Sequence, residues 1–111
     1  NKEIPKERYL IMNEQRAVFI AYNRAHHGII VDTLQKMNLR GYTQWNDVLG
    51  KGSKTGEPHL GSHAWPTVNG AMLVICSAEQ SKNLLSALRK IDQSVPKLGL
   101  RAFTWSVKDS I

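Results

Sequence analysis

The sequence has a single cysteine, Cys76, in a chain of 111 residues, so no disulfide bond within the chain can stabilise the fold. It also lacks a run of about 18 apolar residues, which is the minimum that a membrane-spanning helix needs. Its 15 Lys and Arg residues give a net charge of +6, but they are spread along the chain and accompany no zinc-finger or RNA-binding signature. These absences exclude a disulfide scaffold and a membrane-embedded protein, and they give no reason to expect nucleic-acid binding.

The composition that is present is typical of one soluble globular domain. Hydrophobic residues make up 41% of the chain and charged residues 22%, and the length is sufficient for a core without disulfides or metal. Cys76 ends an apolar run, and such a thiol is typical of core packing in a reducing compartment. We therefore expect a cytoplasmic protein with a domain over residues 16–111, preceded by a polar N-terminal extension, residues 1–15.

The periodicity of the apolar residues predicts six structural elements. Four segments have the composition of strands: 16–22, 42–49, 71–76 and 101–107. Helical spacing predicts a helix over 25–37 with Gly41 as its stop, and a second helix after a capping box of Ser77 and Gln80. Asn69-Gly70 is interpreted as a turn. The order is the ferredoxin-like βαββαβ pattern, an α+β fold with an antiparallel four-stranded sheet, two helices on one face and a long loop between strands 2 and 3.

The second face of this sheet carries large apolar side chains. Trp45, Phe103 and Trp105 together present more apolar area than a small monomer normally exposes. Association of identical chains is the simplest way to cover such a face, and oligomers of one chain usually close by symmetry. We therefore expect a homotrimer that forms through this surface.

The loop after the second predicted strand has the composition of an anion site. The segment Gly50–Gly56 reads GKGSKTG and combines three glycines with two lysines. Backbone N–H groups without neighbouring Cβ atoms, together with ammonium charges, suit a phosphate. The alternative is a flexible connection between two strands, solvated by its lysines. The segment lacks the Gly-Lys-Ser/Thr ending of a P-loop, so we do not expect a P-loop NTPase. The residues expected at the anion are Gly50, Lys51, Gly52, Ser53 and Lys54.

The second half of the loop is rich in residues that bind metals or partners. His59 and His63 are four residues apart and would hold Zn²⁺ or Cu²⁺ if Glu57 or a histidine from another subunit completed the site. Simple solvation of both histidines is the alternative. Trp65 beside Pro66 is an apolar anchor suited to docking a partner or packing on the body. No nucleophile has a neighbouring base in the sequence, so we expect no enzymatic activity.

Two segments resemble the PII signalling proteins of nitrogen regulation: residues 41–57 are similar to the entry into the mobile T-loop of that family, and residues 101–111 to its last core strand. The resemblance covers nearly all the chain after Arg16. It implies a trimer that binds an adenine nucleotide between subunits and engages a transporter, an enzyme or a regulator through the loop. By position it places Gly41 and Thr43 at the base, and Arg101 near the phosphates together with the glycine-lysine segment.

The sequence also departs from the PII pattern. Where that family has two glycines in a second loop, this chain has only Gly99, and the family's C-terminal arginines have no counterpart. The loop after the second strand is shorter and lacks the tyrosine that some members modify. We therefore expect adenine nucleotides to bind weakly or not at all. The alternative is a CutA-like protein, a family with the same subunit fold and a link to divalent metals, which would use His59 and His63.

Overall fold

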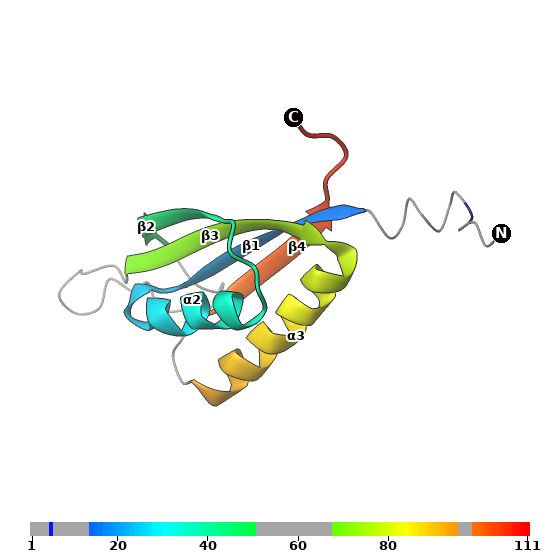
Figure 1. Ribbon diagram of the computed structural model, residues 1–111. Coiled ribbons are helices and arrows are strands. Elements are labelled where there is room, and N and C mark those ends of the chain that lie inside the picture. The colour runs from blue at the N-terminus through cyan, green and yellow to red at the C-terminus, as the bar shows by residue number, and fades with distance from the viewer. Residues whose placement is uncertain (1–4, 6–13, 51–67, 96–98) are drawn as a thin grey trace.

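The computed structural model describes residues 5, 14–50, 68–95 and 99–111. The elements are β1 (Gln15–Asn23), a short 3-10 helix η1 (Arg24–His26), α2 (His27–Lys36), β2 (Thr43–Leu49), β3 (Val68–Ser77), α3 (Ala78–Ser94) and β4 (Arg101–Ser106). The strands form one antiparallel sheet in the order β2-β3-β1-β4, and both helices lie on the same side of it (Figure 1). This arrangement confirms the predicted α+β ferredoxin-like fold.

The core lies between the sheet and the two helices. β1 occupies the centre of the sheet because it pairs with β3 along its whole length and with β4 on its other side. Alternate residues of β1 and β3 face the helices and are completely buried: Val18, Ile20, Tyr22, Met72 and Val74. They pack with Ile30 and Leu34 of α2 and with Leu84 and Leu88 of α3. Each such aliphatic side chain stabilises the fold by about 1.5–3 kcal/mol relative to exposure.

The start of α3 is the capping box that the sequence predicts. The Ser77 hydroxyl accepts a hydrogen bond from the backbone N–H of Gln80 at 3.0 Å, and the side-chain oxygen of Gln80 accepts one from the N–H of Ser77 at 2.9 Å. Two backbone donors that the helix itself leaves unpaired are thereby satisfied. Ser81, on the buried face of the helix, is the one buried polar residue among those described.

The end of α2 differs from the prediction, because Asn38 rather than Gly41 stops the helix. Asn38 has a φ of 59°, in the left-handed region that asparagine adopts more readily than most residues. Its N–H donates to the carbonyl of Gln35 at 2.9 Å, and the N–H of Leu39 donates to the carbonyl of Leu34 at 2.8 Å. These bonds satisfy the last carbonyls of the helix and return Leu39 to the core, where it is buried.

The sheet face opposite the helices, here called the open face, is apolar and exposed. Trp45, Ile75, Phe103 and Trp105 retain 43, 47, 60 and 49% of their accessible surface. The strand register aligns Phe103 with Phe19 on this face, and aligns Ala17 with both Trp105 and Ile75. The exposed aromatic residues therefore form one surface across neighbouring strands, as the sequence predicts.

Cys76 also has the predicted role. Its side chain is buried at the end of β3, and this burial raises the pKa of the thiol. A thiol that resists ionisation is a poor nucleophile, which agrees with packing as its function. No helix in the described part of the chain is long and apolar enough to cross a membrane.

Candidate ligand site at the loop-bearing end of the sheet

Four of the predicted ligand-binding residues lie in the described part of the chain, and the others do not. The described residues are Gly41, Thr43, Gly50 and Arg101. The other four ligand-binding candidates, Lys51, Gly52, Ser53 and Lys54, lie outside the described residues. So do the partner-binding candidates Glu57, His59, His63 and Trp65, of which His59 and His63 are also the metal candidates. Most of the N-terminal extension is also outside them. The geometry of the site therefore comes from the strands and helices that carry the loop.

The loop begins and ends at one end of the sheet. Leu49 at the end of β2 pairs with Val68 at the start of β3, so the chain leaves the sheet at Gly50 and re-enters beside it. The register between the two strands shifts between Trp45 and Val48. A Cβ atom at Gly50 would lie 2.5 Å from Nδ2 of Asn69, so a larger residue there would have to displace that side chain.

Gly70 lies in β3, not in the turn that Asn69-Gly70 suggests in the sequence. A Cβ atom at this position would be 2.8 Å from the ring of Tyr22 on the neighbouring strand. The Tyr22 hydroxyl lies 2.6 Å from Nδ1 of His27, and the two rings stack with their centroids 5.8 Å apart. Burial raises the pKa of Tyr22, and Tyr42 adds to this shift. The glycine is therefore required by a close approach, and that approach joins the sheet to the first residue of α2.

A second link joins the sheet to the helical segment that follows β1. Arg24 of η1 forms an ion pair with Asp47, which lies within the register shift of β2. The two residues are 23 positions apart, so the sequence alone does not indicate that they pair. Both side chains are more than half exposed, so the pair stabilises the protein by no more than about 1 kcal/mol. The pair connects η1 to the edge strand that leads into the loop.

A hollow beside the start of β2 was not predicted from the sequence. It has a volume of about 350 Å³ and is lined by Gln35, Arg40 and Tyr42, next to the predicted ligand residue Gly41. Arg40 forms no ion pair with any described residue. A cation, an amide and a phenol ring can together receive an anionic or aromatic group. The signal in the sequence was the position of Arg40 and Tyr42 on either side of Gly41.

Within one subunit the structure does not bring the predicted ligand residues together. Thr43 and Gly50 lie at opposite ends of β2, and seven strand residues span about 23 Å. Arg101 begins β4, which is the other edge of the sheet, about 14 Å away across three strand spacings. Its guanidinium donates a hydrogen bond to the carbonyl of Leu100 at 2.7 Å. A single site can contain all three residues only if different subunits contribute them.

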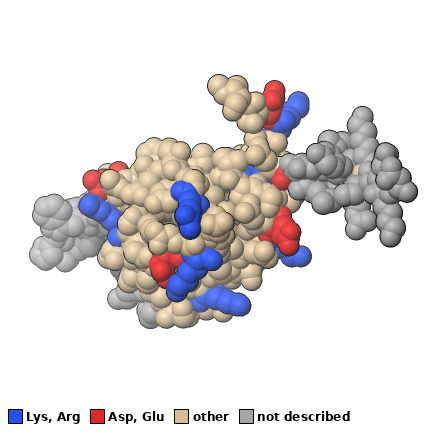
Figure 2. All heavy atoms as spheres, in the orientation of Figure 1, with Lys and Arg blue, Asp and Glu red and all other residues tan. Residues whose placement is uncertain are grey.

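The described residues form no metal-ligand cluster, and the face seen in Figure 2 carries no basic patch. Among the residues that the structure describes, no three His, Cys, Asp or Glu side chains lie close enough together to hold a metal ion. On the face seen in Figure 2, Lys and Arg side chains are separated from one another and interspersed with acidic residues. That face therefore has no continuous basic patch of the kind that binds a nucleic-acid backbone.

Solved structures show the same architecture. The chain is similar to CPII from Thiomonas intermedia K12, a nitrogen regulatory PII-like protein bound to ADP, AMP and bicarbonate. The two structures superpose with a TM-score of 0.66 and 18% sequence identity, and the alignment covers 85% of this chain and 92% of that chain. It is also similar to a putative PII-like signalling protein from Thermus thermophilus, with a TM-score of 0.62, 19% identity, and coverage of 85% and 86%. The chain has the fold of the PII-like proteins.

A third structure with this fold extends the comparison. A DUF3240 family protein from Shewanella baltica has a TM-score of 0.64 and 18% identity, and the alignment covers 89% of this chain and 96% of that chain. The sequence itself matches no family model and no curated protein. At these identities the similarity establishes the PII-like fold, and the bound nucleotides are properties of CPII.

Proposed function

We propose that this protein is a non-catalytic PII-like signalling protein of the cytoplasm. It forms a homotrimer, binds a nucleotide or another small anionic ligand in clefts between subunits, and regulates a partner protein, such as a transporter or a regulator, through the loop of residues 50–70. The observation that carries this proposal is the placement of the candidate site residues on opposite edges of a sheet whose open face is apolar. Such a sheet needs other copies of itself both to cover its face and to complete its site.

The open face supports the trimer. Phe103 and Trp105 lie on an edge strand and Trp45 on the opposite edge strand, so exposed aromatic residues extend across the full width of the sheet. Burying apolar area is worth about 25 cal/mol for each Å². Three sheets that turn their open faces towards a common axis would remove this surface from water without leaving an unpaired copy.

The same packing would bring opposite edges of neighbouring sheets together. The β2 edge carries Thr43 and Gly50, and the β4 edge carries Arg101. In a closed ring each β2 edge faces the β4 edge of the next subunit, so every cleft receives both sets of residues. Backbone N–H groups at Gly50 and the Arg101 charge would then act on one anion.

The chemistry of the ligand follows from these groups. Arginine, lysine and free backbone donors suit a phosphate-bearing molecule, and the phenol of Tyr42 beside Arg40 suits a planar base. The solved CPII structure holds ADP and AMP, which makes adenine nucleotides the first candidates. Because the chain has fewer arginines and glycines than the PII pattern, binding should be weaker than in that family.

Two measurements on the same preparation test the proposal. Light scattering after size exclusion should give three times the subunit mass at micromolar concentration. Calorimetric titration with ADP, AMP and ATP should show binding that Arg101→Ala weakens by about 10-fold or more, since a charge-assisted hydrogen bond contributes about 1.5–3 kcal/mol. The matched control is Lys90→Ala, which removes an exposed charge from α3. A single-subunit mass, or equal affinities in the two variants, would contradict the proposal.

A further inference from the structure

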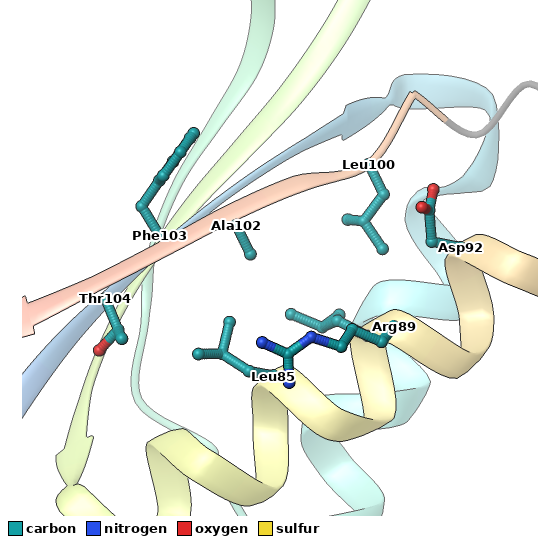
Figure 3. Close-up of a pocket in the computed structure, with 8 residues that line it drawn as sticks. Leu85, Arg89, Asp92, Leu100, Ala102, Phe103 and Thr104 are labelled. Atoms are coloured by element: carbon teal, nitrogen blue, oxygen red, sulfur yellow. The ribbon is translucent and has the colours of Figure 1, made fainter.

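A groove runs between α3 and the edge strand β4 (Figure 3). It has a volume of about 320 Å³, and its lining includes Leu85 and Leu88 from the helix and Ala102 and Thr104 from the strand. Phe103, whose side chain lies on the open face, also lines it, so the groove reaches the outer edge of β4. In the proposed trimer this edge faces β2 of the next subunit. The groove therefore opens towards that subunit.

The strand register places this groove level with the hollow beside β2, which Gln35, Arg40 and Tyr42 line. Register partners cross the sheet from the β2 edge to the β4 edge at one height, in the order Thr43, Leu73, Phe19 and Phe103. Both cavities are lined in part by helix residues, so both lie on the helix side of the sheet. In a ring whose axis runs along the strands, the edges of neighbouring sheets meet at equal height. The hollow of one subunit then lies against the groove of the next.

The groove is apolar and carries one charge of each sign. Figure 3 shows the guanidinium of Arg89 near Leu85, while the carboxylate of Asp92 stands beside Leu100 at the other end. The two charges offset each other, so the groove as a whole does not attract a phosphate. Leucine side chains and a planar guanidinium instead suit an uncharged aromatic ring, because arginine stacks on such rings and donates hydrogen bonds to their nitrogen atoms. The groove therefore fits the base of a nucleotide and not its phosphates.

The hollow supplies a second wall for the same ring. Tyr42 retains 39% of its accessible surface, so its phenol ring is available for stacking. The side-chain amide of Gln35 offers both a donor and an acceptor to the edge of a base. The volumes of the two cavities, about 350 and about 320 Å³, each lie near the lower limit of about 300 Å³ for small-molecule pockets. Joined across a subunit boundary, they fit a nucleotide better than either does alone.

We propose that Leu85 and Arg89 of one subunit and Tyr42 of the next enclose the base of a purine nucleotide. The base stacks between Tyr42 and Leu85, and Arg89 donates a hydrogen bond to a ring nitrogen. A purine is favoured over a pyrimidine because its two fused rings offer more area to both walls. This inference rests on the proposed trimer and its nucleotide site. It assigns recognition of the base to α3, a helix that carries none of the ligand residues named above.

Comparing ADP with CDP separates the base from the phosphates, because the two nucleotides differ only in the base. In calorimetric titrations Arg89→Ala should weaken ADP binding by about 10-fold and reduce the preference for ADP over CDP. Arg101→Ala should weaken both nucleotides equally, since Arg101 is proposed to act on the phosphates. The matched control is Lys90→Ala, because Lys90 is the next residue of α3 and does not line the groove. Equal ADP affinities in Arg89→Ala and Lys90→Ala would overturn the inference.

Mixed trimers test whether the two walls come from different subunits. Tyr42→Ala and Arg89→Ala each alter every cleft when all three subunits carry the same change. When the two variants are coexpressed, about one cleft in four receives an intact Tyr42 from one subunit and an intact Arg89 from the next, so wild-type ADP affinity should return there. The control coexpresses Arg89→Ala with the Tyr42→Ala, Arg89→Ala double variant, which restores no cleft. A first mixture without high-affinity clefts would refute the inference.

These outcomes also distinguish the inference from the proposed function. A wild-type trimer whose ADP affinity falls in Arg101→Ala but not in Arg89→Ala keeps the proposed function and overturns the inference. A trimer that binds CDP as tightly as ADP likewise excludes a purine pocket and leaves the phosphate site in place. A wild-type protein that is monomeric contradicts both.

Discussion

The Tyr22 hydroxyl lies 2.6 Å from Nδ1 of His27, and this contact joins the end of the central strand to the beginning of α2. It exists because Gly70 on the adjacent strand leaves room for the tyrosine ring. The same end of the sheet carries the loop, which leaves after Gly50. The strands that carry the proposed regulatory loop are therefore connected to the helical layer through a partly buried contact.

Gly70→Ala should destabilise the protein. The added methyl carbon would lie 2.8 Å from the Tyr22 ring, so the ring or the strand must move. Overpacking of this kind costs about 1–3 kcal/mol in free energy of unfolding, which denaturant titration measures. Gly28→Ala is the control, because nothing lies within 4 Å of its Cβ position. Within a helix that replacement should be neutral or stabilising by up to about 1 kcal/mol, and equal destabilisation of both variants would contradict the steric account.

The stabilising contribution of Tyr22 should be lost in alkali, as its phenol ionises. Burial raises the pKa of its phenol above the ordinary value of 10.0, so the folded state keeps this proton at a pH where the unfolded chain has lost it. The contribution is complete below pH 10 and is lost as the pH rises from there through the folded pKa. Comparing unfolding free energies of wild type and Tyr22→Phe at pH 9 to 12 measures this. A difference that does not vary with pH would refute the linkage.

Phe103→Asp should dissociate the proposed trimer without unfolding the subunit. The side chain retains 60% of its accessible surface on the open face, so the isolated subunit tolerates a charge there, whereas a buried interface does not. Light scattering should give the mass of one subunit, and circular dichroism should be unchanged. Lys90→Asp places the same charge on the exposed surface of α3 and should leave the trimer intact. A trimeric Phe103→Asp protein would exclude the open face as the interface.

Gly52→Val should abolish anion binding and leave the oligomer intact. A branched side chain in the glycine-lysine segment would block close approach of a ligand to the backbone N–H groups. Calorimetric titration with the nucleotide that binds the wild type best provides the measurement. Hydrogen exchange over residues 50–70 should slow when ligand is added to wild type and not to the variant. Unchanged affinity in Gly52→Val would place the ligand elsewhere.

His59 and His63 remain predicted metal ligands, and they support the CutA-like alternative. Neutral imidazole binds metal, so Zn²⁺ or Cu²⁺ affinity should fall as the pH drops below the ordinary histidine pKa of about 6.5. Replacing both residues with Ala should remove binding in the same titration. Identical titration curves for wild type and the double variant would show that these histidines form no metal site.

Most of the fold was predictable because its signals are local. Apolar runs located β1 and β3, and alternation located β4, since each pattern reflects how one short segment meets the core. The capping box of Ser77 and Gln80 was equally clear, because all its hydrogen bonds form within four residues. The aromatic open face followed from the same alternation once the order of elements indicated that both helices lie on one side.

What the tertiary structure decided depends on contacts between distant residues. Gly70 has the sequence pattern of a turn, yet it belongs to a strand. Glycine is needed at this strand position because the Tyr22 ring, 48 positions away, fills the space that a side chain would need. Thr43, Gly50 and Arg101 form a group in the resemblance to the PII proteins, yet strand geometry separates them within one subunit. The amino-acid order determined which segments become strands and helices. Only the packing of those segments decided which residues share an edge, a groove or a cleft, because such neighbours are set by the whole sheet and not by spacing along the chain.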